Sequence, residues 1–176
     1  DLLKKGVSPC APFAIWSAKF FKKNNLSFFV GILHEDSELT PRAYYLAKKV
    51  SFTNELIYYV RQNPNSITRT PNPKRSFDLV NVVCNNLAKF EELVEPNYKY
   101  IFNNNVAMYL NNALAYICSS DKKIQSELNN TIYNNRHLFK NLMKSTQLKY
   151  RIEACVFFML PKNCVQVYKI MTGKFF

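Results

Sequence analysis

In the second half of this chain, apolar residues recur at intervals of three and four, the spacing of one face of an α-helix. Ser76 is expected to cap the first of these helices, because its hydroxyl can accept from a free backbone N–H. Pro96 is expected to open the second helix, and Ser120-Asp121 to cap the third. A further amphipathic stripe runs over residues 148–160. These patterns predict a small antiparallel bundle of helices.

The first part of the chain mixes helical and extended patterns. One helix is expected from about Ala14 to Lys23, and another from Ser37 to Lys49 with Pro41 in its first turn. Two short β segments are expected at 51–53 and 55–61, the second of them rich in Ile and Tyr. Residues 28–33 are expected to form either a short strand or an extended approach to the acidic turn.

Prolines and asparagines gather over residues 63–75, where they indicate a loop and a natural linker. The chain is therefore expected to divide there. Residues 1–74 would form a first part that carries the small β element, and residues 75–176 a C-terminal α-helical domain. The predicted fold class is mainly α, and α+β overall.

Two adjacent carboxylates, Glu35 and Asp36, lie where an apolar run has stopped at Gly31 and a helical pattern begins. Two roles are open to such a pair. Asp is a favoured helix N-cap, so the pair can simply cap the helix. Alternatively, a carboxylate at the end of a strand can project into the cleft where ligands gather in layered α/β folds.

The order of residues around this pair resembles the family 2 glycosyltransferases, and more narrowly the bacterial enzymes that build capsular and lipooligosaccharide chains. The resemblance covers about residues 7–70. It is carried by Pro12, Trp16, Lys19-Phe20-Phe21, Asn25, Phe28, Gly31, His34-Glu35-Asp36, Ala47-Lys48-Lys49-Val50, Tyr58-Tyr59 and Asn65-Ser66-Ile67.

The resemblance implies the acceptor half of a GT-A domain and sugar transfer with inversion. Asp36 matches the position of the family's catalytic base, and Glu35 is the second candidate. Trp16 would supply an apolar platform for a sugar ring. His34 would orient the acidic pair or contact phosphate, and Arg61 would reach the pyrophosphate of the donor. The acceptor would be a glycan or a lipid-linked acceptor.

The family's nucleotide-sugar half, with its Asp-x-Asp motif, would lie upstream of this chain. The sequence begins at Asp1 and contains no Asp-x-Asp. The chain is therefore expected to be the C-terminal part of a longer enzyme and inactive alone. A divalent metal, Mn or Mg, is expected in that parent enzyme, with no metal-ligating residue in this fragment.

A net charge of +12 adds an alternative from another class. Residues 121–176 hold ten basic residues and three acidic ones, which favours an anionic partner. The alternative is a non-catalytic basic helical module that binds a protein partner or an anionic membrane surface. No nucleic-acid-binding motif is recognisable, so nucleic acid is not expected.

Apolar runs are too short to span a bilayer, and the five cysteines form no Cys-x-x-Cys pair. The protein is expected in the cytoplasm, either free or peripheral on the inner face of the cytoplasmic membrane.

Overall fold

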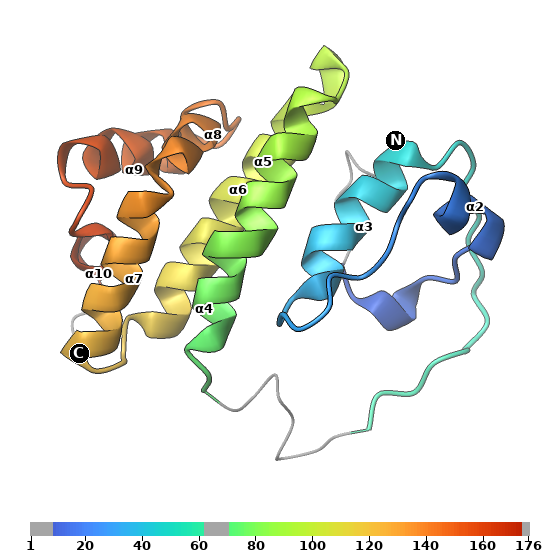
Figure 1. Cartoon of the computed structure of the whole chain (residues 1–176), viewed down its shortest axis with the longest axis horizontal. Helices are drawn as coiled ribbons and strands as arrows, with labels where there is room; N and C mark the ends of the chain where they lie inside the picture. The colour runs from blue at the N-terminus through green and yellow to red at the C-terminus, as the bar shows by residue number, and fades with distance from the viewer. Residues whose placement is uncertain (1–8, 62–70, 174–176) are drawn as a thin grey trace.

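The computed structural model describes residues 9–61 and 71–173, and it is mainly helical (Figure 1). One long helix begins at Lys74. It consists of α4 (Lys74–Asp78), a π-helical turn, η2 (Leu79–Cys84), and α5 (Asn85–Glu92). The longest helix, α6 (Pro96–Ile117), lies alongside it and runs back in the opposite direction (Figure 1).

Four further helices and a 3₁₀ turn complete this half: α7 (Lys122–Asn134), η3 (Arg136–Leu138), α8 (Phe139–Met143), α9 (Leu148–Met159) and α10 (Cys164–Thr172). Because α6 packs on η2, α5, α7, α8 and α10, its apolar side chains form the centre of the main core. Phe102, Leu110 and Leu114 of α6 are completely buried there. Burial of this apolar surface is the main term that stabilises the bundle.

The first part of the chain contains a 3₁₀ turn, η1 (Ala11–Phe13), and two helices, α2 (Ala18–Lys23) and α3 (Glu35–Leu46). A second, smaller core joins them, in which Leu26, Leu39 and Ala43 are buried. The other face of α3 packs on η2 and α5, so α3 connects the two cores. Tyr45 lies in this contact, because its ring packs on Phe90 of α5, and its hydroxyl also accepts from the backbone N–H of Glu95, just before α6, at 3.0 Å.

The expectation of β segments is wrong for the residues that the structure describes. Residues 28–33 form bends and a turn, and 48–61 run extended with no strand partner (Figure 1). The sequence pattern gives a strand its propensity, but a strand also needs a neighbour for its backbone N–H and C=O groups. No such neighbour lies within the described ranges.

Several expected helix starts also shift. The first helix begins at Ala18 rather than Ala14, with Ser17 as its N-cap accepting from the Phe20 N–H at 3.3 Å. α3 begins at Glu35 instead of Ser37, so Pro41 lies in its second turn. Ser76 is inside α4, where its hydroxyl donates to the Ala113 carbonyl at 2.8 Å instead of capping the helix.

Three helical expectations are confirmed. Pro96 opens α6. Asp121 caps α7, where its carboxylate accepts from the Ile124 N–H at 2.9 Å. The stripe that begins at Leu148 forms α9. The described residues include no helix long and apolar enough to cross a membrane.

Candidate functional site

The acidic pair lies in the first turn of α3, and both side chains are half-buried. One oxygen of Asp36, Oδ1, accepts from the Ser37 backbone N–H at 2.7 Å. The other, Oδ2, has no hydrogen-bond partner among the described residues. The N-cap position belongs to His34, so the interpretation of Asp36 as the helix cap is wrong. The pair therefore places a carboxylate at the positive end of a helix, with one oxygen held and the other without a partner in the described part of the chain.

Two buried or half-buried groups flank Asp36. Tyr109 of α6 is close to it, and burial raises the pKa of the Tyr109 hydroxyl to about 12, even though a hydrogen bond with Ser37 lowers this pKa. On the other side lies Cys10, whose thiol pKa is raised by burial and by the negative charge of Asp36. The Pro9 carbonyl accepts from the Thr40 hydroxyl at 3.1 Å and holds this segment against α3.

His34 adopts a left-handed backbone conformation, with φ 68° and ψ 34°. Few residues other than glycine adopt it, although His is among those that do. Its ring stacks on Tyr116, with the centroids 5.9 Å apart, and its Nε2 accepts from Arg75 Nε at 3.3 Å. Burial lowers the pKa of His34, and the Arg75 guanidinium lowers it further, because both disfavour the imidazolium; the nearby carboxylates act against this.

The loop before His34 is tied to the start of α4. Leu33 N–H donates to Asp78 Oδ2 at 2.7 Å, and Lys74 Nζ donates to the Gly31 carbonyl at 2.8 Å. Lys74 also forms an ion pair with Asp78. Gly31 has φ 85°, a conformation that glycine adopts without a steric penalty. These contacts fix where the first turn of α3 begins.

Glu38, one turn further along α3, was not singled out from the sequence. It is almost fully buried, at 1% exposure, and pairs with Arg42 at 2.6 Å. Asn86 of α5 donates to its second oxygen at 3.2 Å. The Glu–Arg spacing of four residues was a readable signal. Because both oxygens are occupied, Glu38 joins α3 to α5 and is not available as a base.

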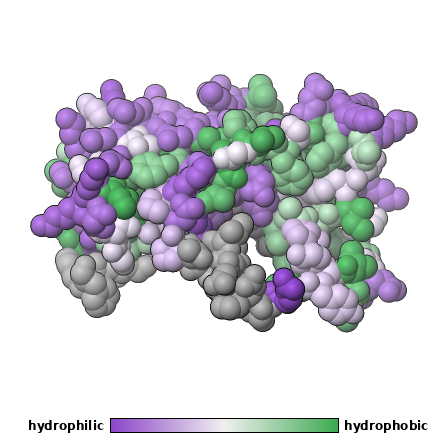
Figure 2. Space-filling view, turned by 60° about the horizontal axis from the view of Figure 1, so that its bottom comes forward, coloured by the Kyte–Doolittle hydropathy of each residue, from purple (hydrophilic) through white to green (hydrophobic). Residues whose placement is uncertain are grey.

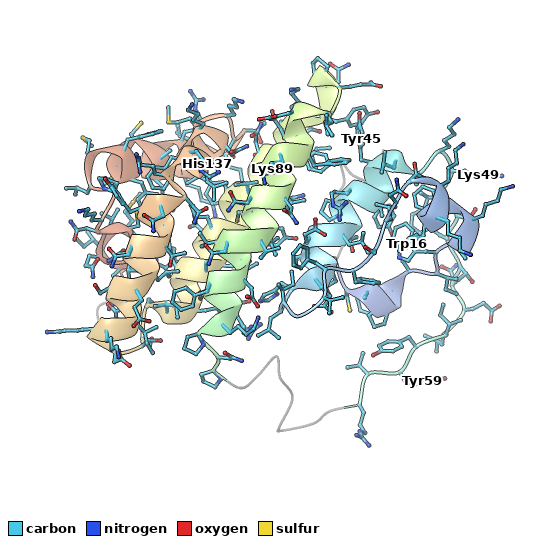
Figure 3. All side chains as sticks on the ribbon, in the orientation of Figure 1. Trp16, Tyr45, Lys49, Tyr59, Lys89 and His137 are labelled. Carbon is cyan, nitrogen blue, oxygen red and sulfur yellow. The ribbon has the colours of Figure 1, made fainter. Side chains whose placement is uncertain are left out.

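Trp16 lies between α2 and α3 (Figure 3), where it contacts Tyr44 near the end of α3, whereas the acidic pair begins this helix. Its ring packs against Phe20, Phe21 and Tyr44, with centroids 5.0 to 6.2 Å apart. It also lines a cavity of about 930 Å³, here called the Trp16 cavity, between residues 12–24 and 44–58. None of His34, Glu35, Asp36 and Arg61 lines this cavity.

The structure therefore brings three of the five expected residues together and separates two. His34, Glu35 and Asp36 are consecutive at the start of α3, whereas Trp16 belongs to the second core. Arg61 is exposed at the end of the extended segment. Within 9–61 and 71–173, no cluster of three or more His, Cys, Asp or Glu side chains could hold a metal ion, so the described residues do not fit a metal site.

Comparisons with protein-family models, with curated proteins and with solved structures found no match to this chain.

Proposed function

We propose that this chain carries the acceptor side and the catalytic base of an inverting glycosyltransferase that acts in cell-surface polysaccharide synthesis. Asp36 is the base and Glu35 its neighbour. In this reaction the acceptor hydroxyl oxygen attacks the anomeric carbon of a nucleotide sugar, its proton passes to the carboxylate, and the nucleotide leaves with the bonding electron pair.

The observation that carries the proposal is the hydrogen bonding of the two Asp36 carboxylate oxygens. Its Oδ1 is held by the Ser37 N–H at 2.7 Å, which fixes the rotamer, and its Oδ2 has no hydrogen-bond donor among the described residues and so can accept a proton. A general base needs hydrogen-bond reach to the hydroxyl and a fixed position. The contacts of Glu38, Asp78 and Lys74 supply that fixed position by holding α3 and the preceding loop.

Of the other expected residues, only His34 lies next to the acidic pair. It is held by Arg75 and Tyr116, which suits the orientation of the first turn of α3. Trp16 and Arg61 are not proposed to contact the same sugar as Asp36. The nucleotide sugar and its Mn or Mg ion are proposed to bind residues outside the described ranges.

The first prediction tests the base in the protein as its source cells make it. In a strain whose own gene copy is deleted, an Asp36→Asn allele is expected to lower sugar transfer from labelled nucleotide sugars onto endogenous acceptors by about 10²–10⁴-fold. Glu35→Gln is expected to have a smaller effect. Transfer is measured in cell extracts after immunoblotting has shown equal amounts of protein.

Asp121→Asn is the matched control, since Asp121 also begins a helix and Asn still caps it. Transfer at the wild-type rate by the Asp36→Asn allele would overturn the proposal. A larger loss for Glu35→Gln than for Asp36→Asn would move the base to Glu35.

A second candidate function is favoured by the surface of α9 and α10. Six large apolar side chains there are exposed by 47% or more: Leu148, Ile152, Phe158, Met159, Leu160 and Ile170. Basic side chains, among them Lys149 and Arg151, are exposed on the same helices. This combination suits a peripheral contact with an anionic membrane, which is compatible with glycosyl transfer to a lipid-linked acceptor.

A further inference from the structure

The Trp16 cavity has walls that are mainly apolar. Its lining comes from the chain on both sides of α3, and it includes the side chains Phe13, Ile15, Phe20, Phe52, Leu56 and Ile57. At about 930 Å³ it falls within the range of cavities that bind small organic ligands in proteins. Glu35 and Asp36 do not line this cavity, so the cavity is separate from the acidic pair.

Much of the apolar surface of these walls is exposed to solvent. Phe52, Leu56 and Ile57 are 75%, 81% and 58% exposed. Figure 2 shows hydrophobic residues at the surface on the side that carries this extended segment. Covering such surface is favourable by about 25 cal/mol for each Å² removed from water. An occupant with a hydrocarbon body would therefore be stabilised here.

The charges around the cavity favour an anion. Four exposed lysines line it, Lys19 and Lys23 from α2, with Lys48 and Lys49 after α3, against the single acid Glu55. None of the four lysines is in an ion pair with a described residue. Lys49 extends outward at the edge of this part of the molecule (Figure 3). An ammonium group is a compact charge that suits phosphate oxygens.

We propose that the Trp16 cavity binds a single-chain amphiphile with a phosphate head, the hydrocarbon chain lying against the apolar walls and the phosphate among the four lysines. The proposal does not depend on the transferase activity. Trp16 acts in it as a wall of the cavity. Loss of ligand binding and loss of sugar transfer are therefore separate outcomes.

The test uses the fluorescence of Trp16, which is the single tryptophan of the chain and lines the cavity. Decyl phosphate, kept below its micelle concentration, is expected to shift the emission to shorter wavelength in a saturable way. Decyl maltoside has the same chain without the charge, and inorganic phosphate has the charge without the chain. Each is expected to bind at least about tenfold more weakly.

Equal binding of decyl phosphate and decyl maltoside would overturn the role of the lysines. Equal binding of decyl phosphate and inorganic phosphate would overturn the role of the apolar walls. No saturable change with any of the three probes would overturn the site itself.

Two variants separate the contributions of the walls and the rim. The double variant Lys48→Gln/Lys49→Gln is expected to weaken decyl phosphate about three- to tenfold and to leave decyl maltoside unchanged. Leu56→Asn is expected to weaken both probes. The matched control is Lys122→Gln/Lys123→Gln, an exposed pair at the start of α7 that does not line the cavity. An equal loss in the control would show attraction to net charge and would overturn the site.

Discussion

His34 combines three unusual properties in one residue. It adopts a left-handed backbone conformation, its ring contacts both Arg75 and Tyr116, and its pKa is lowered by burial and by Arg75. The neutral imidazole can accept from Arg75 Nε, whereas an imidazolium cannot. The hydrogen bond that joins His34 to Arg75 of α4 therefore requires the neutral imidazole.

The second prediction follows from the lowered pKa of His34. Unfolded His has a pKa of about 6.5, so between that value and the lower folded pKa the unfolded state binds more protons. Folding stability should fall as pH decreases through this window. His34→Asn tolerates the left-handed backbone but does not titrate. The difference in Tm between wild type and variant should narrow as pH falls from about 7.5 to about 5.5.

Circular dichroism melts over this pH range measure both proteins. Other titrating groups, such as Glu153, whose pKa is raised by burial, are present in both and cancel in the difference. Parallel curves of Tm against pH would show that His34 does not couple to folding.

At the scale of elements, the π turn η2 depends on one asparagine. The Asn85 side-chain amide donates to the Val80 carbonyl at 2.8 Å and to Asn135 Oδ1 at 2.8 Å. Its own oxygen is 2.8 Å from His137 Nε2. A π turn leaves carbonyls without the usual helical donor, and Asn85 supplies one while it also joins this helix to the end of α7.

The third prediction is that Asn85→Ala lowers the free energy of unfolding by about 1–3 kcal/mol, because partners of a half-buried amide lose their hydrogen bonds. Urea denaturation followed by circular dichroism measures this loss. Asn130→Ala is the control, since Asn130 is exposed on α7 and Ala is a better helix former. A loss of similar size in both variants would contradict a specific role for Asn85.

The sequence was informative where local signals decide the structure. Pro96 and Asp121 mark helix starts because proline and aspartate each act on the backbone next to them. The prediction of β segments over 51–61 was wrong, because β-propensity does not specify whether a second strand is near. The contact of His34 with Arg75 and Tyr116 could not be predicted either, since Arg75 lies about forty and Tyr116 about eighty positions beyond His34 in the sequence.

The same contrast between local signals and contacts distant in sequence applies to the candidate site. The pair Glu35-Asp36 was recognisable as the start of a helix. The N-cap, however, is His34, and no sequence pattern predicted its left-handed backbone conformation. The Trp16 cavity is formed by segments before and after α3, so only their packing reveals it.

At the scale of the whole molecule, exposed apolar side chains and positive charge occur together on the C-terminal helices. The chain carries a net charge of +12, and Leu148, Met159 and Ile170 of α9 and α10 are 66%, 71% and 65% exposed. Each basic group near an anionic membrane contributes about 1 kcal/mol, and this attraction is screened by salt.

The fourth prediction is weak, salt-sensitive binding to vesicles that contain anionic lipid. Lys149→Gln/Arg151→Gln on α9 is expected to reduce the bound fraction several-fold in a sedimentation assay, and high salt is expected to reduce it further. The α7 pair Lys122→Gln/Lys123→Gln should bind as wild type does. Binding unchanged by salt would indicate apolar insertion instead, and no binding at low salt would leave this surface without a membrane role.

The π turn η2 also sets the angular relation between the two ends of the long helix. A helix advances by about 100° for each residue, so the widened turn rotates Arg75 and Asp78 relative to the face that Leu87 presents to the core. Loss of the codon for Asn81, which is exposed in this turn, would keep a continuous helix and the packing of Leu87 beyond it. It would turn Arg75 and Asp78 away from His34 and Leu33, and so uncouple the acidic pair from the long helix.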